Sequence, residues 1–320
     1  MRVAIAAVAA IALGSLSVVA QSPKTYRVPK TVDGVPDFTG NWTNATYTPL
    51  ERPAQFANRE FFTPEEAEKY VKSRDESFNN QAADDIHYDN SLWQTENYKK
   101  GVNSLRTSLI VDPPDGKLPP LTDAARNRPA GPVVGEGQAS RRGDSYENRT
   151  WGERCVSWGN DGPPMMPVGY NANLDVLQGP GYVVVRNEMI HSARIIPTDG
   201  NRPHISEKLR NWNGDSRGHW EGNTLVVETT NFNAKVRYRN STPAIKVTER
   251  FTRTDADDID YQVTVDDPNT WTRPWTASIP LRKVPGPIYE YACHEGNYGL
   301  PNILRAQRVE DAKAAAGVKD

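Results

Sequence analysis

The feature that most constrains the fold is an alternation of side chains in the second half of the chain. In one run Val247, Glu249 and Phe251 alternate with Lys246, Thr248 and Arg250. Residues 259–265 repeat the same period after a short polar connection at 255–257. A period of two is typical of β-strands with one buried face, because successive side chains point to opposite sides of a strand. These runs therefore predict adjacent antiparallel strands.

Similar runs precede and follow this pair. They cover residues 182–185, 193–196, 219–220, 224–228, 271–281 and 288–292. Glu221-Gly222-Asn223 supplies a tight turn between two of them, because glycine tolerates a positive φ. Six or more antiparallel strands form a meander, whose edges are protected when it closes as a barrel or stacks as a sandwich. We therefore expect a mainly β fold of this kind, with an N-terminal helical segment and a C-terminal helix.

Helix signals lie on either side of the meander. Thr63-Pro64-Glu65-Glu66 is a capping box with proline at the first helical position, and it predicts a helix over about 64–77. Residues 107–111 read as a short strand, and Thr122 as the cap of a short helix before Arg128. Asn302 is the expected cap of a last helix over 303–316, which Gly317 ends.

We expect one domain after an export signal. Arg2 precedes an apolar run over 3–19, and small residues lead up to Ala20, so we expect a signal peptide (1–20) cleaved after Ala20. The run is too short for a membrane anchor, and we expect no integral membrane protein. The domain, 21–320, then comprises an irregular and helical part (21–150), the β meander core (151–300) and the C-terminal helix (301–320).

Export also changes how the two cysteines are interpreted. In the periplasm or outside the cell, Cys155 and Cys293 are expected to form a disulfide, with two separately buried thiols as the alternative. The chain has 38 Lys and Arg against 40 Asp and Glu, and no block of like charges. A nucleic-acid partner is therefore not expected, since a binder needs a basic face. No nucleotide-binding glycine loop is present, so we expect no nucleotide cofactor.

Histidines in polar turns are the first candidates for chemistry. An imidazole oriented by a carboxylate can act as a general base, and an arginine beside it can hold an anion. The expected catalytic residues are His191, Glu188, Arg194, His294 and Glu295. The alternative, that loop histidines and Arg–Asp pairs only tie loops together, is equally compatible with the sequence. His219 is expected to point to solvent from its strand.

A divalent metal is a second hypothesis. No HExxH or CxxC motif is present, so ligands would have to converge from separate loops. The candidate ligands are His191, His204 and His294. We therefore expect either no cofactor or a divalent metal.

Aromatic and polar side chains give candidates for substrate binding. These are His204, Asp215, Arg217, Trp271, Trp275 and Tyr298, which would contact a small molecule or a glycan. Core packing is the competing and favoured interpretation of the tryptophans. The Gly- and Pro-rich segment 158–167 follows Cys155 and is a candidate lid or pocket rim.

Gly214-Asp215-Ser216-Arg217-Gly218 matches the G-x-S-x-G nucleophile elbow. Its surroundings do not fit, because an elbow lies between a buried strand and a helix, whereas a β-hairpin follows here. We instead expect a glycine-bounded turn in which Asp215 and Ser216 bond to local main-chain amides.

Three phrases carry a resemblance. They are Glu188-Met189-Ile190-His191-Ser192-Ala193-Arg194-Ile195-Ile196, Trp220-Glu221-Gly222-Asn223-Thr224-Leu225-Val226-Val227-Glu228-Thr229 and Glu290-Tyr291-Ala292-Cys293-His294-Glu295-Gly296-Asn297-Tyr298. The chain resembles a group of exported bacterial proteins without an assigned activity. The resemblance implies a periplasmic or secreted location and no particular reaction. Gly40-Asn41-Trp42 is similar to the G-x-W that begins lipocalin barrels, which implies a lipocalin-like barrel with a central cavity, although the insert that follows departs from that pattern.

Together these features lead to one functional hypothesis and two alternatives. The favoured hypothesis is an exported enzyme that cleaves a small polar substrate, such as a glycan fragment or a plant-derived compound, by lyase or hydrolase acid–base chemistry. The first alternative is a non-catalytic, lipocalin-like binding protein of the bacterial envelope. The second is a structural envelope protein. The sequence leaves the oligomeric state open.

Overall fold

The computed structural model describes residues 26–79, 104–129, 143–159, 161–235 and 238–317. The expected signal peptide, 1–20, lies outside these residues. Within the described part of the chain, no helix has both the length and the apolar character needed to cross a membrane.

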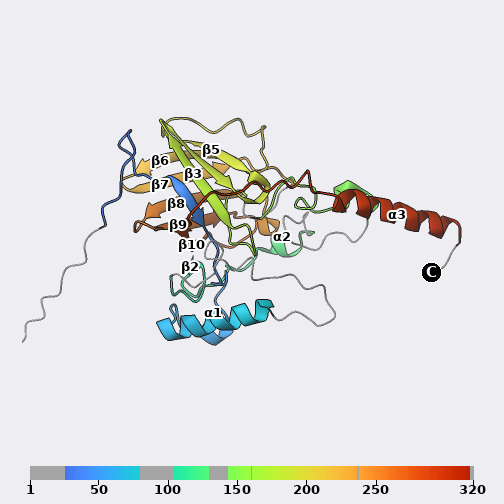
Figure 1. The fold of residues 1–320 in the computed structure, drawn as a ribbon, viewed down its shortest axis with the longest axis horizontal. Helices are drawn as coiled ribbons and strands as arrows, with labels where there is room; N and C mark the ends of the chain where they lie inside the picture. Colours follow the sequence, from blue (N-terminus) through green and yellow to red (C-terminus); the bar gives the residue numbers. More distant parts are fainter. Residues whose placement is uncertain (1–25, 80–103, 130–142, 160, 236–237, 318–320) are drawn as a thin grey trace, which may run out of the picture.

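The described residues include ten strands, which form one antiparallel sheet (Figure 1). They are β1 (Gly40–Thr43), β2 (Ile110–Asp112), β3 (Asn173–Gly179), β4 (Tyr182–Asn187), β5 (Ala193–Pro197), β6 (Asp215–Glu221), β7 (Thr224–Thr230), β8 (Lys246–Arg253), β9 (Asp258–Asp266) and β10 (Trp275–Lys283). The order across the sheet is β5-β4-β3-β1-β10-β9-β8-β7-β6, and β2 also pairs with β10. The expected mainly β meander is therefore confirmed.

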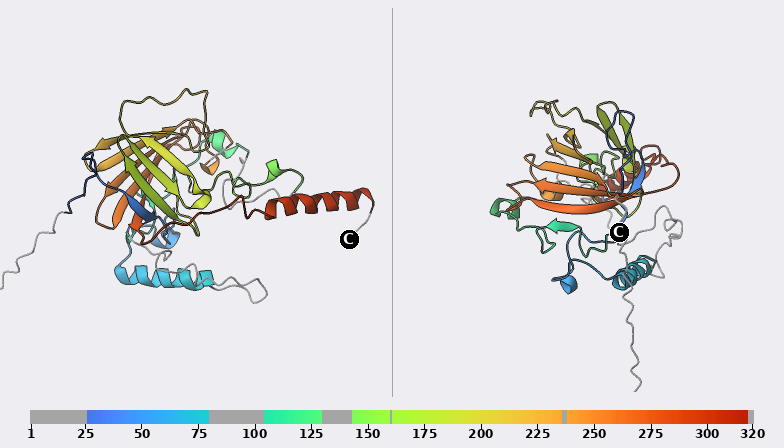
Figure 2. Two further views of the ribbon diagram at one scale, coloured as in Figure 1. Left: turned by 45° about the horizontal axis from the view of Figure 1, so that its top comes forward. Right: turned by 90° about the vertical axis from the view of Figure 1, so that its left-hand side faces the viewer.

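The sheet curls until its two end strands, β5 and β6, meet (Figure 2). Gly218 on β6 permits this approach. A Cβ atom at that position would lie 3.1 Å from Cγ2 of Ile196 and 3.2 Å from Cγ2 of Thr198. We call the line where β5 meets β6 the seam. Side chains pack closely there, but among the described strands these two are not paired by a ladder of main-chain hydrogen bonds. The fold is thus a nearly closed barrel, and the sandwich alternative is wrong.

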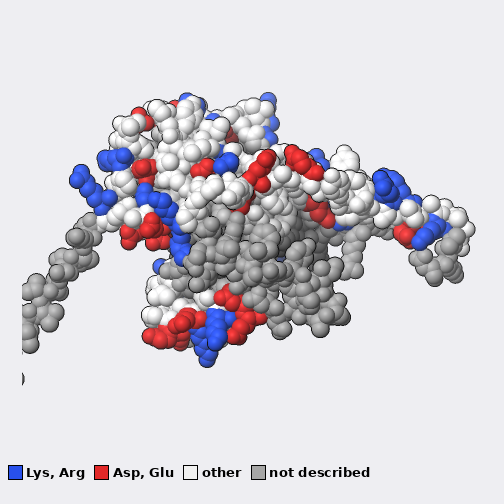
Figure 3. Space-filling model, in the orientation of Figure 1, with Lys and Arg blue, Asp and Glu red and all other residues white. Residues whose placement is uncertain are grey.

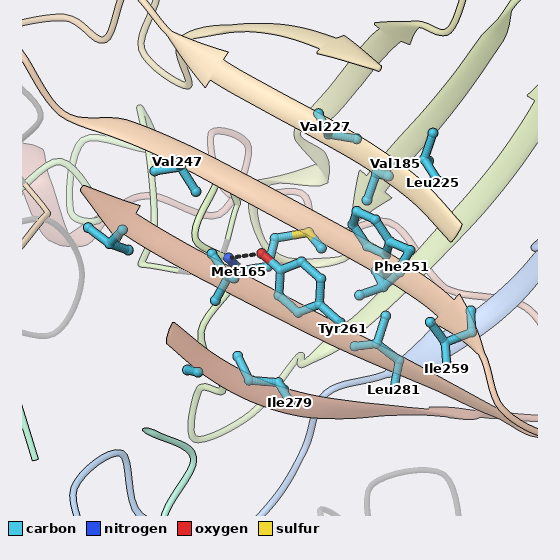
Figure 4. Packing of buried hydrophobic residues seen from close by; sticks show 14 of the residues in the cluster. Met165, Val185, Leu225, Val227, Val247, Phe251, Ile259, Tyr261, Ile279 and Leu281 are labelled. Carbon is cyan, nitrogen blue, oxygen red and sulfur yellow. Dashed lines mark hydrogen bonds between the residues drawn. The ribbon is translucent and has the colours of Figure 1, made fainter. Parts of the chain in front are cut away.

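Inward-pointing residues of the strands form the hydrophobic core. Figure 4 shows Val247 and Phe251 on β8 beside Tyr261 on β9, with Met165 packed among them. The alternation predicted for β8 and β9 is confirmed, since their buried and partly exposed residues alternate along both strands. Trp271 and Trp275 are buried in the same core and pack edge to face. Side chains of the protein therefore occupy the middle of the barrel.

Helices lie outside the barrel (Figure 1). Helix α1 (Pro64–Asn79) begins at the predicted capping box: Thr63 N donates to Glu66 Oε2 at 2.9 Å, and Glu66 N donates to Thr63 Oγ1 at 3.3 Å. Thr122 caps α2 (Asp123–Arg126) as expected. On the face shown in Figure 3, acidic and basic side chains are mixed, including along α1.

The C-terminal helix, α3 (Gly299–Ala315), extends away from the barrel (Figures 1 and 2). The predicted start at residue 303 is wrong, because Asn302 lies inside the first turn and Tyr298 precedes the helix. Tyr298 makes no side-chain cap, but Asn297 does: its Oδ1 accepts from Leu300 N at 3.3 Å. The predicted end is close, with Gly317 at a φ of +71° just beyond the helix.

Several predictions of strands and turns also need correction, and residues 288–292, expected as a strand, form none. Residues 215–218 belong to β6 and do not form the expected turn, although Gly214 has the positive φ of a turn residue. The run expected from residue 271 becomes a strand only at Trp275, and the strand expected over 107–111 is shifted to β2. Strand β3 was not predicted. The Gly222 turn between β6 and β7 is confirmed, with a φ of +61°.

The disulfide between Cys155 and Cys293 is confirmed, and it joins residues 138 positions apart. Its sulfur atoms pack with Met189 and Ile190, which follow β4. The bond therefore fastens the segment before α3 to the end of the barrel where β4 finishes and β5 begins.

The closure of the barrel at Gly218 can be tested by substitution. We expect Gly218→Val to force β5 and β6 apart and to lower the free energy of unfolding by about 1 to 3 kcal/mol, as overpacking does. The matched control is Gly179→Val on β3, because a Cβ there meets nothing within 4 Å. Urea unfolding of both variants measures the difference. Equal stabilities of the two variants would contradict close packing at the seam.

Candidate active site

A buried ion pair crosses the interior of the barrel. Arg194 of β5 donates to both carboxylate oxygens of Glu249 on β8, at 2.5 Å from Nη1 and 2.9 Å from Nη2. The Tyr261 hydroxyl donates to Glu249 Oε1 at 2.9 Å, and Met165 N donates to the Tyr261 oxygen at 3.1 Å (Figure 4). The exposed fraction is 6% for Arg194 and 0% for Glu249. These four residues form a continuous chain of hydrogen bonds inside the core.

Charges buried in this way need strong partners, because removing an ion from water is costly. Burial alone would lower the pKa of Arg194, but the Glu249 carboxylate beside it raises that pKa above its ordinary value. Burial and the same carboxylate raise the pKa of Tyr261 well above its ordinary value. Arginine therefore stays charged here, and tyrosine stays a neutral hydrogen-bond donor.

Asp161 is a second buried carboxyl group in this part of the barrel, and its charge interacts with that of Arg194. It is 2% exposed. Ser157 Oγ donates to its Oδ1 at 3.1 Å, whereas its Oδ2 is buried and makes no hydrogen bond within the described structure. Burial raises the pKa of Asp161 to about 6, against the lowering effect of hydrogen bonds at Trp158 and Ser157. This carboxyl can therefore gain or lose a proton near neutral pH.

Half-buried side chains connect Asp161 to the surface of the protein. Asn187 and Asn213 each donate to its main-chain oxygen at 3.2 Å, and Asn213 also donates to Ser192 Oγ at 3.1 Å. Ser192 and Asn213 are only half-buried. Asn213 packs closely on Gly162, where a Cβ atom would lie 2.6 Å from Asn213 Oδ1. We call Asp161, Ser192, Arg194, Asn213 and Glu249 the barrel-end site.

Segment 158–167 forms one wall of this site. It was expected as a lid or a pocket rim, but Asp161 and Met165 are buried and reach into the end of the barrel. This part of the segment therefore borders the site, and its expected role as a lid stays a prediction. Its glycines and prolines give no periodic pattern, and this is why the sequence did not place Asp161 inside.

Two of the predicted catalytic residues lie beside the barrel-end site. Glu188 is buried and precedes the 3-10 turn η4 (Met189–His191), in which Ile190 and His191 both have positive φ. His191 is exposed, and its Nδ1 lies 3.0 Å from the main-chain oxygen of Tyr291. A carbonyl only accepts, so Nδ1 carries the proton and Nε2 is left as the acceptor.

The remaining predicted catalytic residues differ in their surroundings. Arg194 is held by Glu249 and does not contact His191 in any described bond. His294 and Glu295 are exposed in the turn before α3, which the disulfide brings to this end of the barrel. Tyr298, expected to bind substrate, is exposed at the start of α3.

Three predicted substrate-binding residues do meet, on the outer face of the barrel. His204 Nδ1 lies 2.8 Å from Asp215 Oδ2, and Arg217 Nη1 donates to Asp215 Oδ1 at 2.8 Å. Asp215 also accepts from Ile205 N, and Arg217 donates to the Pro203 oxygen. This group of side chains therefore fastens the loop at 203–205 to β6. That role agrees with the alternative in which loop histidines and Arg–Asp pairs only tie loops together.

Ser216 is not part of this group. It lies between Asp215 and Arg217 on β6 and therefore points to the opposite, inner face. Its hydroxyl is buried and shares a hydrogen bond of 2.8 Å with Thr229 Oγ1. The nucleophile-elbow pattern is thus accidental in this fold. His219 is exposed on the outer face, as predicted.

The other expected contacts with ligands are not brought together. Trp271 and Trp275 are buried in the core, so they are not exposed for contact with a substrate. Among the described residues, no three His, Cys, Asp or Glu side chains lie close enough to hold a metal ion. His191, His204 and His294 therefore do not form the ligand set that was considered.

The comparison with known proteins adds no assignment: no protein-family model matches the chain, and no curated protein is significantly similar to it. The resemblances to exported bacterial proteins and to lipocalins stay predictions. The function must accordingly be argued from the side chains of the barrel-end site.

The ion pair predicts an asymmetry between single and double substitutions. Arg194→Met leaves Glu249 buried without its cation, so we expect the free energy of unfolding to fall by about 3 to 5 kcal/mol. Adding Glu249→Gln should recover most of this loss, because the amide oxygen still accepts from Tyr261. Urea unfolding of both variants provides the measurement. A double variant no more stable than Arg194→Met would contradict the argument.

Asp161 predicts a dependence of stability on pH. Its pKa is about 6 in the folded protein, above the ordinary 3.8 expected for the unfolded chain. Between these values the folded state holds a proton that the unfolded chain releases, so stability falls as pH rises through this window and then levels off. Asp161→Asn removes this loss. At about pH 8 the variant should exceed the wild type by up to about 3 kcal/mol, with the difference shrinking toward about pH 4.

Thermal unfolding of wild type and Asp161→Asn across this pH range measures the effect. The control is Asp175→Asn, whose carboxylate pairs with Arg186 on the outer face of the sheet. A stability difference between Asp161→Asn and wild type that does not change with pH would show that Asp161 has an ordinary pKa.

Proposed function

We propose that the protein is an exported enzyme that cleaves a small polar substrate by acid–base chemistry, as a hydrolase or a lyase. One observation carries this proposal. Asp161 is a buried carboxyl with an unpartnered oxygen and a pKa of about 6, it lies under the half-buried Ser192 and Asn213, and it interacts with a buried arginine. Perturbed carboxyls in such surroundings are enriched at active sites.

The electrostatics suit a group that exchanges protons. Burial favours the neutral form of Asp161, whereas hydrogen bonds at Trp158 and Ser157 favour the carboxylate. Because these effects oppose each other, both protonation states are populated near neutral pH. A general acid or base is most efficient when its pKa lies near the working pH.

In this proposal Asp161 works with Glu188 and His191. In hydrolysis, protonated Asp161 gives its proton to the leaving oxygen as the C–O bond breaks, while Glu188 takes a proton from the attacking water. In elimination, a base takes the proton next to the leaving group, the C–O bond breaks to form a double bond, and Asp161 protonates the leaving oxygen. The acceptor Nε2 of His191 is the second candidate base, at the exposed rim.

An extracytoplasmic location supports an exported enzyme. The Cys155–Cys293 disulfide is of the kind that persists in oxidising compartments. The expected signal peptide and the periplasmic or secreted location remain part of the proposal. The disulfide also holds η4, with Glu188 and His191, against the segment before α3.

The barrel fold favours one alternative, a non-catalytic binding protein that retains a small ligand. Against it, side chains of the core occupy the middle of the barrel, including Met165 and Tyr261. A binding protein of this type would retain one ligand without turnover, and its affinity would not change in His191→Gln. It would also have no need for a proton-exchanging carboxyl at the barrel end.

The test is turnover by the mature chain, from Gln21 on, with digests of plant cell-wall polysaccharides. New reducing ends report both reactions, and ultraviolet absorbance of a new double bond reports elimination alone. We expect Asp161→Asn to lower the rate by about 10²- to 10⁴-fold, the usual contribution of a positioned acid or base. Asp175→Asn, which alters an outer-face carboxylate, should keep the wild-type rate.

Two outcomes would overturn the proposal. One is a wild-type rate in Asp161→Asn, which would remove the carboxyl from the mechanism. The other is stoichiometric retention of a digest component with no turnover by the wild type, which would establish the binding protein. A rate that rises or falls with an apparent pKa near 6, and loses that step in Asp161→Asn, would support the assigned role.

A further inference from the structure

Three aromatic side chains and an arginine form a cluster, in which two of the rings are exposed. The ring centroids of Trp151 and Trp212 are 5.1 Å apart, and the Arg154 guanidinium lies 4.6 Å from the Trp151 ring and 5.0 Å from the Tyr146 ring. Tyr146 is 52% exposed and Trp212 is 37% exposed, whereas Trp151 is buried. We call these four residues the aromatic platform. Trp151 anchors it, and Tyr146 and Trp212 present their rings to the outside.

Local bonds hold the platform in place. Thr150 N donates to Glu153 Oε2 at 2.9 Å, and Glu153 N donates to Thr150 Oγ1 at 3.1 Å, which fixes the turn that carries Trp151 and Arg154. Trp151 Nε1 donates to the Lys235 main-chain oxygen at 3.1 Å. The disulfide at Cys155 fastens the same turn to the end of the barrel. The rings are therefore preorganised, which lowers the entropy lost when a ligand binds.

Neighbouring residues connect the aromatic platform to the barrel-end site at two points. Trp212 precedes Asn213, which donates to the Asp161 oxygen and to Ser192 Oγ. On the other side, Gly152 packs against the ring of Trp158, whose main-chain oxygen accepts from Asp161 N. Trp212 is therefore one residue from a side chain that bonds to Asp161, and Trp158 bonds to Asp161 directly through its main chain.

The chemistry of the platform fits a carbohydrate. A flat aromatic face stacks on the axial C–H groups of a pyranose ring, and β-1,4-linked glucose and xylose present such groups on both faces. Arginine supplies N–H donors for hydroxyl groups. The exposed amide residues Asn148 and Asn211 flank Tyr146 and Trp212 in the chain. Aromatic rings bordered by polar groups suit a sugar, because its ring presents both C–H groups and hydroxyl groups.

We propose that the aromatic platform, with Tyr146 and Trp212 as its stacking residues, binds β-1,4-linked glucan or xylan oligosaccharides and directs them to the barrel-end site. This inference rests on the proposed function for the role of that site, and it names the substrate class. It assigns to Tyr146 and Trp212 a binding role and no part in the bond cleavage.

Binding is measured by calorimetry with cellohexaose and xylohexaose, using Asp161→Asn so that no substrate is consumed. We expect at least one of the two to bind, and Trp212→Ala and Tyr146→Ala each to weaken Kd by about tenfold, the range of one aromatic contact. Trp212→Phe, which keeps a ring, should recover most of the affinity. Circular dichroism of each variant confirms that it has folded.

The matched control is Tyr182→Ala. Tyr182 is also 37% exposed with an arginine, Arg202, over its ring, but it begins β4 at the end remote from Asn187 and Glu188. Its removal should leave Kd unchanged. Failure of both oligosaccharides to bind would overturn the inference, as would binding that is unaffected by Trp212→Ala.

The two proposals can fail separately. If the oligosaccharides bind through Trp212 but the wild type does not cleave them, the platform stands and the proposed acid–base activity fails on this substrate class. If Asp161→Asn abolishes turnover of another digest component while neither oligosaccharide binds, the activity stands and the platform proposal is overturned.

Discussion

The ion pair between Arg194 and Glu249 is the interaction on which the rest of the structure depends. It joins β5, at one end of the sheet, to β8, near the other end, and so it spans the interior of a barrel whose seam has no ladder. Bidentate geometry and the Tyr261 hydroxyl satisfy the carboxylate, and such complete bonding is what makes a charged pair tolerable in a core. Because Tyr261 in turn accepts from Met165 N, the pair also positions the irregular segment that closes this end.

Asp161 derives its properties from that arrangement. The same segment that brings Met165 into the core also buries Asp161, and burial disfavours the ionised form of its carboxyl. Hydrogen bonds at Trp158 and Ser157 oppose this effect, and the pKa of Asp161 lies at about 6. The disulfide and Asn213 then connect this interior group to the surface, through η4 on one side and Trp212 on the other.

Much of the fold could be predicted from local chemistry. Period-two alternation identified β8 and β9, Gly222 marked a turn, and the Thr63–Glu66 box marked the start of α1, because each feature depends on neighbouring residues. The start of α3 was placed too late because Asn302 was taken as its cap, whereas the capping side chain is that of Asn297. The 215–218 segment was misread because its flanking glycines suggested a turn, whereas Gly218 serves the contact between β5 and β6, which is remote in sequence.

The candidate site was harder to predict, and Glu249 shows what the sequence did contain. Its side chain lies on the buried face of β8, between those of Val247 and Phe251. An acidic side chain in that position must have a hydrogen-bonding or charged partner. The alternation therefore already required a buried cation or hydroxyl, and Arg194, at the corresponding inward position of β5, was the available arginine. The sequence around Asp161 gave no comparable signal, because side chains in a Gly- and Pro-rich segment do not alternate between two faces. A charge at an inward strand position is thus the better guide to this site than histidines in turns, whose side chains mostly remain exposed here.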